Sequence, residues 1–264
     1  MLDQHEDPLV SIVTVSFNAE LTISATIESV ASQKGVRIEH IIVDGASTDG
    51  TISVVERYRQ QLALFISEPD DGLYFAMNKG AAKATGTYLA FLNADDVYAH
   101  DGVVAAAITA IERENVEASY ADLVFIDSND GDKVKRVWTS QPHREGLCWN
   151  GWMPAHPTLF MQRRIFDELG GFDVGLKYQS DLEFCARAFE VRKIQSVYVA
   201  DTWVRMRLGG ISTGEWGRRI EGNWESYQAL KKLGLKRNPI SFFTLKFASK
   251  LPQWFKRKRE NRFR

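Results

Sequence analysis

Apolar residues in the first part of the chain follow two alternating patterns. Short runs rich in β-branched and aromatic residues are typical of strands, and they fall at residues 10–17, 38–43, 64–67 and 88–92. Between these runs, apolar residues recur at three- and four-residue spacing, which predicts helices at residues 21–30, 51–62 and 74–84. Strands that alternate with helices in this way build a parallel, doubly wound α/β sheet.

The second part of the chain is less regular. Its pattern predicts helices at 102–114, 163–169 and 181–190, and strands at 118–126, 133–139, 158–161 and 194–207. A hairpin-like turn is expected at 127–131, and Ser180 is a suitable N-cap for the helix at 181–190. Residues 205–213 contain two glycines and are predicted to form a flexible loop. Two more helices are expected at 215–233 and beyond Pro239.

Charge is unevenly distributed along the 264 residues. The net charge is −1, but the segment 231–264 carries twelve Lys or Arg against one acid, Glu260. The first 230 residues carry 21 basic and 33 acidic residues. We therefore divide the chain into a domain at 1–214 and a helical, basic amphipathic segment at 215–264 that is expected to meet something anionic.

The bulk composition excludes several classes of protein. Cys148 and Cys185 stand far apart without a CxxC, so neither a zinc site nor a disulfide framework is indicated, which fits a reducing cytosol. The acidic N-terminus lacks the apolar core of a signal peptide, and no apolar run is long enough for a membrane span. We expect a cytoplasmic protein, in solution or at the inner face of the cell membrane.

Carboxylates follow the predicted strands. Asp44 ends the second strand, Glu68 and Asp70 follow the third, and the pair Asp95–Asp96 follows the fourth. Open α/β sheets bind ligands at the carboxyl ends of their strands. Two adjacent carboxylates repel each other, and Mg²⁺ or Mn²⁺ is the usual way to neutralise them beside a phosphate. The alternative reading of Asp95–Asp96 is a solvated acidic turn.

Ordinary nucleotide-binding fingerprints do not occur. There is neither a GxGxxG after the first strand nor a GxxxxGK[ST]. A metal, rather than a glycine loop, would therefore meet the phosphates of a nucleotide.

Four segments in order, SIVTVSFN, IIVDGASTDGT, EPDDGLYFAMNKG and GTYLAFLNADD, resemble the nucleotide-binding half of family 2 glycosyltransferases with the GT-A fold. The resemblance implies a Rossmann-like, mostly parallel sheet with flanking helices, and a donor-binding half at 8–100 followed by an acceptor half at 101–214. It places donor contacts at Thr14, Ser16, Asn18, Asp44, Glu68, Asp70, Lys79, Asn93 and Asp95. The metal would be held by Asp95 and Asp96, with Asp96 favoured. Asn93 stands where many relatives have an acid.

A second set of residues matches the inverting members of this family. Gly171-Phe172-Asp173 is followed by Asp181 and Arg187, with Ser180 in place of the usual first acid. The resemblance implies that Asp181 is the catalytic base, because the corresponding Asp deprotonates the acceptor hydroxyl. On spacing alone, Asp181 would only complement the dipole of its helix.

Aromatic and basic residues complete the expected site. Trp152 and His156, in a segment dense in aromatics, are candidate acceptor contacts, and a buried aromatic cluster with a structural histidine is the alternative. In similar enzymes the region of Arg205 and Arg207 closes over the donor diphosphate, which guanidinium groups match well. A solvated face is the alternative for these arginines.

The basic segment interleaves large apolar residues with cations that include Lys246 and Lys250. Such a helix suits an anionic membrane surface. Nucleic-acid binding is disfavoured because no recognition motif accompanies the charges, and a solvated tail is a further alternative.

Together these features predict a metal-dependent, inverting glycosyltransferase. It would transfer a sugar from a nucleotide donor, expected to be UDP-linked, to a hydroxyl of a glycan or lipid-linked acceptor in polysaccharide biosynthesis. The alternatives are a sugar-phosphate nucleotidyltransferase, which would carry a Gly-rich basic loop after the first strand, and an inactive nucleotide-sugar-binding module.

Overall fold

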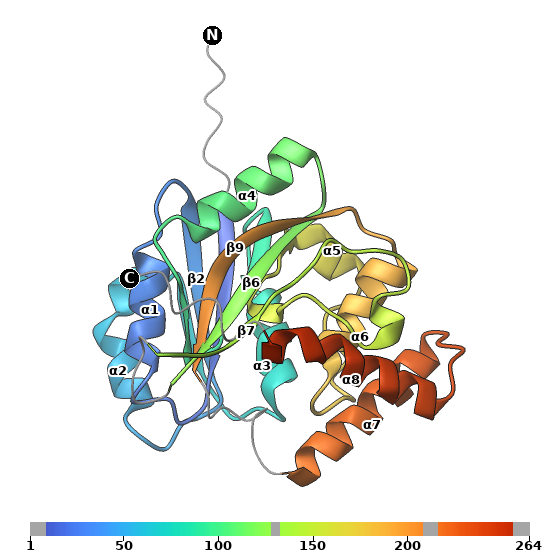
Figure 1. Cartoon of the computed structure of the whole chain (residues 1–264). Helices are drawn as coiled ribbons and strands as arrows, with labels where there is room; N and C mark the ends of the chain where they lie inside the picture. Colours follow the sequence, from blue (N-terminus) through green and yellow to red (C-terminus); the bar gives the residue numbers. More distant parts are fainter. Residues whose placement is uncertain (1–8, 128–132, 208–215, 256–264) are drawn as a thin grey trace.

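The structure, a computed structural model, describes residues 9–127, 133–207 and 216–255, with the backbone alone for 216–220 and 248–255. Its strands form one curled sheet in the order β3-β2-β1-β4-β8-β6-β9-β5, and β7 pairs with β6. Helices cover both faces of this sheet (Figure 1). The expected α/β architecture is confirmed.

The first half of the chain forms the predicted alternation of strands and helices. The strands are β1 Leu9–Ser16, β2 Arg37–Asp44, β3 Leu64–Ser67 and β4 Tyr88–Phe91. The helices are α1 Ile23–Ala31, α2 Thr51–Arg57 and α3 Leu73–Ala81, with a 3-10 turn at Arg59–Gln61. Because β1 pairs in parallel with β2 and β4, and β2 with β3, the carboxyl ends of all four strands lie at one edge.

The second half adds antiparallel pairing to this sheet. The strands are β5 Asp96–Tyr98, β6 Ala118–Ile126, β7 Val134–Trp138, β8 Phe160–Gln162 and β9 Ser196–Arg207. The helices are α4 Val103–Glu114, α5 Arg163–Glu168 and α6 Ser180–Ala186, which continues as a π-helical turn Arg187–Val191. 3-10 turns lie at Cys148–Asn150 and His156–Thr158. β8 joins the halves by pairing antiparallel to both β4 and β6, and β9 runs parallel to β6.

Alternate residues of β1 point to opposite faces of the sheet, as a strand buried on both sides requires. Val13 and Val15 belong to the apolar cluster that also contains residues of α3, α5 and α6. Val10 and Ile12 belong to the cluster under α4. α1 and α2 pack around Ile42 of β2, on the face opposite to α3 (Figure 1).

The short strand β5 is not predicted by the sequence pattern. Its three residues begin at Asp96 and follow the acidic turn directly, so no run of apolar residues marks them. β5 exists because it pairs antiparallel with β9, where Asp96 lies opposite Met206 and Val97 opposite Arg205. This pairing brings the end of β9 beside the acidic pair.

Two local expectations are wrong. α6 begins at Ser180, and Gln179 takes the N-cap position, while the buried Ser180 hydroxyl has no hydrogen-bond partner among the described residues. Arg205 and Arg207 lie in β9, within the predicted strand 194–207 and not in the overlapping predicted loop, because pairing with β5 and β6 extends the strand to Arg207. The rest of the predicted loop, 208–213, lies outside the described residues, as does most of the predicted turn 127–131.

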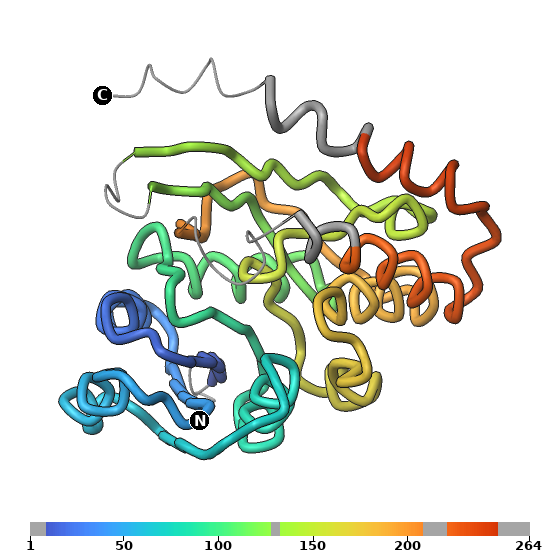
Figure 2. Tube along the Cα trace, turned by 90° about the horizontal axis from the view of Figure 1, so that it is seen from below, coloured from blue at the N-terminus to red at the C-terminus, as the bar shows by residue number. Residues whose placement is uncertain are grey.

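The C-terminal helices α7 Trp216–Lys232 and α8 Pro239–Phe255 pack beside α6 (Figure 1). Figure 2 shows α8 running along one side of the molecule. Tyr227, Leu230 and Phe242 belong to the same apolar cluster as the residues of α6. Among the described residues, no helix combines the length and apolarity needed to cross a bilayer.

Lys246 corrects the expectation for the basic segment. The sequence groups it with the cations that would meet an anionic surface, but its side chain is buried, with 6% exposed. The position of α8 explains this, because the helix turns this side chain toward Gln179 and Ser226 and not toward solvent.

The close approach of β4 to β1 gives a test of the sheet. A Cβ at Gly86, just before β4, would lie 2.7 Å from the backbone nitrogen of Ser11 and 2.8 Å from the carbonyl oxygen of Leu9. Backbone atoms cannot give way, so Gly86→Ala is expected to lower the free energy of unfolding by about 1–3 kcal/mol.

Urea unfolding measures this loss. Gly102→Ala is the matched control, because a Cβ there would meet nothing closer than 3.5 Å. Equal stabilities of the two variants would contradict the packing described here.

Candidate functional site

The acidic pair at the end of β4 is desolvated. Asp96 is completely buried and Asp95 is half-buried. Burial, and then the neighbouring Asp95, raise the pKa of Asp96 well above its usual range. Burial also raises the pKa of Asp95, and Arg207 opposes this rise. The structure therefore brings Arg207 of β9 to the acidic pair.

The acidic pair has the properties of a divalent cation site. Asn93 donates a hydrogen bond of 3.4 Å to Oδ2 of Asp96, but Oδ1 of Asp96 has no partner among the described residues. A buried carboxylate oxygen without a partner is costly, and a cation would satisfy it. Carboxylate oxygens are hard ligands, so the residues present fit Mg²⁺ or Mn²⁺.

Asp44 holds together the ends of the first three strands. Its Oδ1 accepts hydrogen bonds from the hydroxyls of Ser16 (2.9 Å) and Ser47, and its Oδ2 accepts from the Ser67 hydroxyl (2.8 Å) and the Ser47 amide (2.9 Å). Asp44 is completely buried. Asp44 and Ser16 therefore shape the edge at which a donor would bind, and their own hydrogen bonds are largely used within the protein.

Beyond this network, an exposed aromatic ring stands at the end of β1. The Phe17 side chain is 61% exposed. A Cβ at Gly45 would lie 3.5 Å from the Phe17 ring and 2.9 Å from the Asp70 carboxylate, so these residues surround one point. Asn18, in a left-handed conformation (φ 49°), accepts a hydrogen bond of 2.9 Å from the Thr48 amide. This is an edge on which a planar base can stack.

Three other predicted donor residues have partners within the protein. The completely buried Thr14 hydroxyl lies 2.9 Å from Nε2 of His40, so the structure does not bring Thr14 to the edge. Burial keeps His40 neutral by lowering its pKa to about 3. Lys79 and Glu68 form an ion pair of 2.8 Å with each other.

Asp181, the predicted base, lies in the first turn of α6. Its Oδ1 accepts hydrogen bonds from the Tyr74 hydroxyl (3.3 Å) and from the Leu182 amide (2.8 Å). Burial raises the pKa of Asp181, and these hydrogen bonds and Lys246 oppose the rise. A carboxylate with a raised pKa is a better proton acceptor, as general-base chemistry requires.

Sequence reasoning missed Tyr74. It lies in α3, immediately after the turn of the EPDDGLY segment, so a residue of the donor half touches the candidate base of the acceptor half. The sequence feature that could have identified Tyr74 is a tyrosine at the start of a helix that follows an acidic turn.

Phe172 connects Tyr74 to β4. Its ring lies 5.4 Å from the ring of Tyr74 and 5.2 Å from that of Phe91, the last residue of β4. Asn78 of α3 donates to the Phe172 carbonyl and accepts from the Phe172 amide, both at 2.9 Å. Because the acidic pair follows Phe91 closely, this packing fixes Asp181 relative to Asp95 and Asp96.

Arg187 holds the glycine turn before Phe172. Its guanidinium donates to both carboxylate oxygens of Glu183, at 2.7 and 2.8 Å, and to the carbonyls of Leu169 and Gly171. Gly171 has φ +73°, and a Cβ there would lie 2.7 Å from Oδ1 of Asn78. The arginine and the glycine of the motif are therefore explained by packing.

Trp152 and His156, the predicted acceptor contacts, lie in the core. Trp152 packs edge-on against Tyr120 at 6.1 Å, and His156 stacks on Phe91 at 5.7 Å. Burial lowers the pKa of His156 to about 4, and both ring nitrogens lack a partner among the described residues. The alternative reading, a buried aromatic cluster with a structural histidine, is the one that the structure supports, because neither side chain is exposed enough to meet an acceptor.

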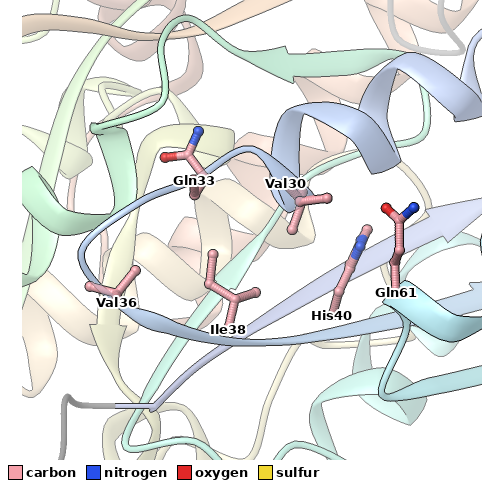
Figure 3. Close-up of a pocket in the computed structure, with 7 residues that line it drawn as sticks. Val30, Gln33, Val36, Ile38, His40 and Gln61 are labelled. Atoms are coloured by element: carbon pink, nitrogen blue, oxygen red, sulfur yellow. The ribbon is translucent and has the colours of Figure 1, made fainter.

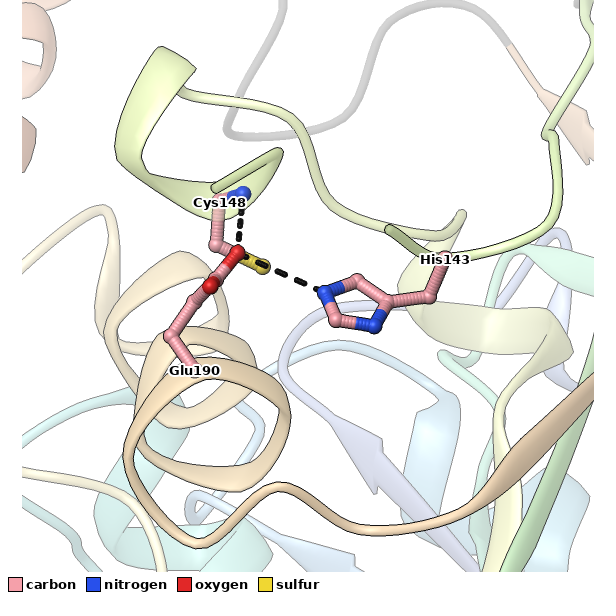
Figure 4. Close-up of side chains that lie close together, drawn as sticks. All are labelled: His143, Cys148 and Glu190. Carbon is pink, nitrogen blue, oxygen red and sulfur yellow. Dashed lines mark hydrogen bonds and ion pairs between the residues drawn. The ribbon is translucent and has the colours of Figure 1, made fainter. Parts of the chain in front are cut away.

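Three residues with metal-ligand chemistry meet elsewhere in the acceptor half (Figure 4). Ligand atoms of His143, Cys148 and Glu190 lie within 4.8 Å of one another. However, the two oxygens of Glu190 already accept from the amides of Gly146 (2.8 Å) and Cys148 (2.9 Å). Burial raises the pKa of the Cys148 thiol well above its usual range, so it stays protonated. Glu190 therefore serves to hold the backbone of the loop before Trp152 through these hydrogen bonds, and a metal is not needed to explain the cluster.

A hollow of about 460 Å³ lies between α1 and the first half of β2 (Figure 3). Val30, Ile38 and His40 line it. It is remote from the carboxyl end of β2 at Asp44, and the acids described above do not contribute to it. It is therefore distinct from the candidate site.

Comparisons with known sequences identify the family of the chain. The profile of the protein family "Glycosyl transferase family 2" matches residues 11–170. An uncharacterized glycosyltransferase of Mycobacterium tuberculosis is 33% identical over 184 residues, which cover 69% of each chain. A PGL/p-HBAD biosynthesis glycosyltransferase of Mycobacterium bovis is 28% identical over 193 residues, covering 69% of this chain and 70% of the relative. A putative teichuronic acid biosynthesis glycosyltransferase of Bacillus subtilis is 39% identical over 97 residues, 36% of this chain and 38% of the relative.

Solved structures share the fold. S. aureus TarS 1–349 in complex with UDP-GlcNAc has a TM-score of 0.68 at 17% identity, over 96% of this chain and 74% of that chain. In the longer TarS crystal structure, the match covers 44% of that chain. A mannosyltransferase of Pyrobaculum calidifontis in complex with GDP-Man and Mn²⁺ has a TM-score of 0.66 at 20% identity, over 93% of this chain and 70% of that chain. The GT-A-like fold is thereby confirmed.

The buried His156 predicts a pH dependence of stability. Its pKa is about 4 in the folded chain against 6.5 for an ordinary histidine, so the unfolded chain binds a proton first as the pH falls. This lowers the free energy of unfolding by about 2 kcal/mol between pH 7 and 5. His156→Leu is expected to lack this part of the loss.

Urea unfolding of both proteins at pH 7 and pH 5 measures the difference. An equal loss of stability in the wild type and in His156→Leu would show that the histidine is protonated in the folded state.

Proposed function

The chain belongs to glycosyltransferase family 2, and we propose that it transfers a sugar from a UDP-linked donor to an acceptor hydroxyl with inversion at the anomeric carbon. The observation that carries this proposal is the packing of Phe172, which holds a desolvated base, Asp181, at a fixed position relative to the acidic pair. One base and one anion-neutralising site suffice for a single in-line displacement.

Asp181 acts as the base in this proposal. It takes the proton of the acceptor hydroxyl while that oxygen forms a bond to the anomeric carbon. The bond from the anomeric carbon to the diphosphate oxygen breaks at the same time, and its electron pair leaves with the nucleoside diphosphate. Tyr74 keeps the carboxylate oriented through its hydrogen bond of 3.3 Å.

Asp95 and Asp96 would hold Mg²⁺ or Mn²⁺. The cation, when bound, neutralises the charge that develops on the leaving diphosphate. Asp96 offers a buried oxygen, Oδ1, that has no partner among the described residues, and the half-buried Asp95 beside it can supply a second ligand atom. Arg207, with Arg205, adds positive charge at the end of β9 beside the pair. A related fold in complex with GDP-Man and Mn²⁺ supports the assignment.

The base of the donor would stack at the end of β1. Phe17, Asn18 and Asp70 offer an aromatic face, an amide and a carboxylate there, and Asp44 and Ser16 hold the edge in shape. Glu68 and Lys79 flank this region as an ion pair. We assign UDP because TarS, which shares the fold, is described in complex with UDP-GlcNAc.

The acceptor would be a lipid-linked glycan at the inner face of the cell membrane. Relatives that carry the names of teichuronic acid and PGL/p-HBAD biosynthesis support an acceptor of this class. Ile240 and Phe247 of α8 are 81% and 69% exposed, and seven residues, or about two helical turns, separate them, so they share one face. Basic residues follow in the sequence up to Arg264. An exposed apolar stripe beside cations is suited to an anionic lipid surface.

The reaction is tested by incubation with a panel of UDP- and GDP-sugars in the presence of Mn²⁺. Release of UDP from one donor is expected, and EDTA is expected to stop it because the acidic pair then loses its cation. Asp181→Asn should lower the rate at least about a hundredfold while donor affinity stays the same.

The matched control is Asp167→Asn, which removes an exposed carboxylate in the same half of the chain. Full transfer by Asp181→Asn would refute the assignment of the base, and release that survives EDTA would refute the metal.

Membrane docking is tested with Ile240→Glu/Phe247→Glu, which places two charges on the apolar stripe of α8. Binding to vesicles that contain phosphatidylglycerol is expected to fall at least about tenfold, because charged side chains do not enter the apolar layer. Sedimentation of the vesicles measures bound protein.

Asn223→Glu/Gln228→Glu adds the same charge at exposed positions of α7 and serves as control. Equal vesicle binding by both double variants would contradict docking through α8.

A further inference from the structure

A single carboxylate of α7 holds the segment that leads into the helix of the candidate base. Glu225 accepts hydrogen bonds from three consecutive amides, those of Lys177 (2.6 Å), Tyr178 (2.7 Å) and Gln179 (2.9 Å). α6 begins at the next residue, Ser180, and Asp181 follows it. Charge-assisted hydrogen bonds of this kind are short and strong, so this backbone is fixed from outside its own helix.

A buried lysine of α8 completes the same contact. Nζ of Lys246 donates to the Ser226 hydroxyl at 2.7 Å and lies 3.5 Å from Oε1 of Gln179. The Ser226 hydroxyl lies 2.8 Å from the same oxygen of Gln179. Glu225 therefore holds the backbone amide of Gln179, while Ser226 and Lys246 hold its side-chain oxygen.

The fold makes specific room for Lys246. A Cβ at Gly151 would lie 2.8 Å from Cγ and Cδ of Lys246, and Gly151 has φ +74°, a conformation that favours glycine. The Lys246 ammonium also lies 5.8 Å from the centroid of the Phe242 ring. Burying an ammonium group is unfavourable unless hydrogen bonds and charges compensate it. A buried Lys246 therefore indicates that its contacts contribute to the structure around Gln179.

Charged and titratable groups from several elements surround Asp181. Tyr74 faces it from α3, Lys246 from α8 and Cys185 from its own helix, while Glu225 of α7 lies close enough to influence Tyr74. Lys246 is the cation of this group, and it opposes the effect of burial on the pKa of Asp181.

We propose that Glu225 and Lys246 are positioning residues for Asp181, so that the C-terminal helices α7 and α8 form part of the support of the active site. Glu225 fixes the backbone of residues 177–179, and Lys246 fixes the side chain of Gln179, two residues before the base, and places its positive charge on that side of the base. This inference rests on the proposed function, because it takes Asp181 to be the catalytic base.

The test uses two variants of the full chain with matched controls. Glu225→Gln replaces one acceptor oxygen by a donor, and Glu221→Gln makes the same charge change at an exposed position about one turn earlier on α7. Lys246→Met removes the ammonium at similar length, and the exposed Lys232→Met is its control. Thermal unfolding identifies any variant that does not fold, and Glu225→Asp and Lys246→Gln then take its place.

Amide hydrogen exchange of residues 177–182 provides a readout that does not need activity. Exchange is expected to be at least about tenfold faster in Glu225→Gln than in Glu221→Gln, because the amides lose a carboxylate acceptor. Equal exchange in the two variants would overturn the role of Glu225. If the wild type released nucleotide from none of the UDP- and GDP-sugars, the proposed function would fail, while this exchange result would still decide whether the contact exists.

Kinetics separate positioning from general stability. With the best donor of the panel, kcat of Glu225→Gln is expected to fall roughly ten- to a hundredfold while KM for the donor stays within about twofold. Glu225→Asp, which keeps the charge, should recover part of the loss. A change confined to KM, or no recovery by the Asp variant, would overturn the proposal.

The pH profile tests Lys246. Asp181 must be deprotonated to act, so activity is lost as the pH falls through its pKa. Without the ammonium, the pKa of Asp181 rises, and the acid limb of the kcat profile is expected to move to higher pH in Lys246→Met but not in Lys232→Met. An acid limb at the wild-type position would overturn the role of Lys246.

Discussion

The packing of the Phe172 ring determines how Asp181 lies relative to the acidic pair Asp95–Asp96. It packs against Phe91 at the end of β4 and against Tyr74 of α3, whose hydroxyl reaches Asp181. Asn78 fixes the Phe172 backbone with two hydrogen bonds. Since aromatic rings in a close-packed core cannot shift independently, this packing couples the position of Asp181 to that of the acidic pair. In this account the catalytic geometry is a property of the core between the halves.

Desolvation acts on both carboxylate sites, and each has its own compensation. At the acidic pair, burial and mutual repulsion favour protonation, and Arg207 with the proposed cation opposes them. At Asp181, burial also favours protonation, and Tyr74, an amide and Lys246 oppose it. The C-terminal helices would therefore support the base as well as the proposed docking, because the exposed face of α8 carries Ile240 and Phe247 while its buried face carries Lys246.

Much of this organisation could be predicted from the sequence. The strands of the first half are short apolar runs with clear ends, so the sequence alone places the acids that follow them at one edge of the sheet. The predictions that were wrong, and the features that were missed, depend on contacts between residues far apart in the sequence. β5 forms only by pairing with β9, and Trp152, His156 and Lys246 look exposed or reactive by residue type but are enclosed by segments far along the chain. Glu225 could not be identified because its partners are backbone amides, which have no sequence signature.

In the proposed function, a nucleotide sugar binds at the carboxyl edge of the sheet, between the acidic pair and Asp181. A crystal structure of the chain with Mn²⁺ and an unreactive phosphonate analogue of a UDP-sugar tests it most directly. We expect the cation on Asp95 or Asp96, the uracil ring beside Phe17, and the anomeric carbon facing Asp181. A nucleotide bound elsewhere, such as in the hollow between α1 and β2, or a cation that touches neither Asp95 nor Asp96, would contradict it.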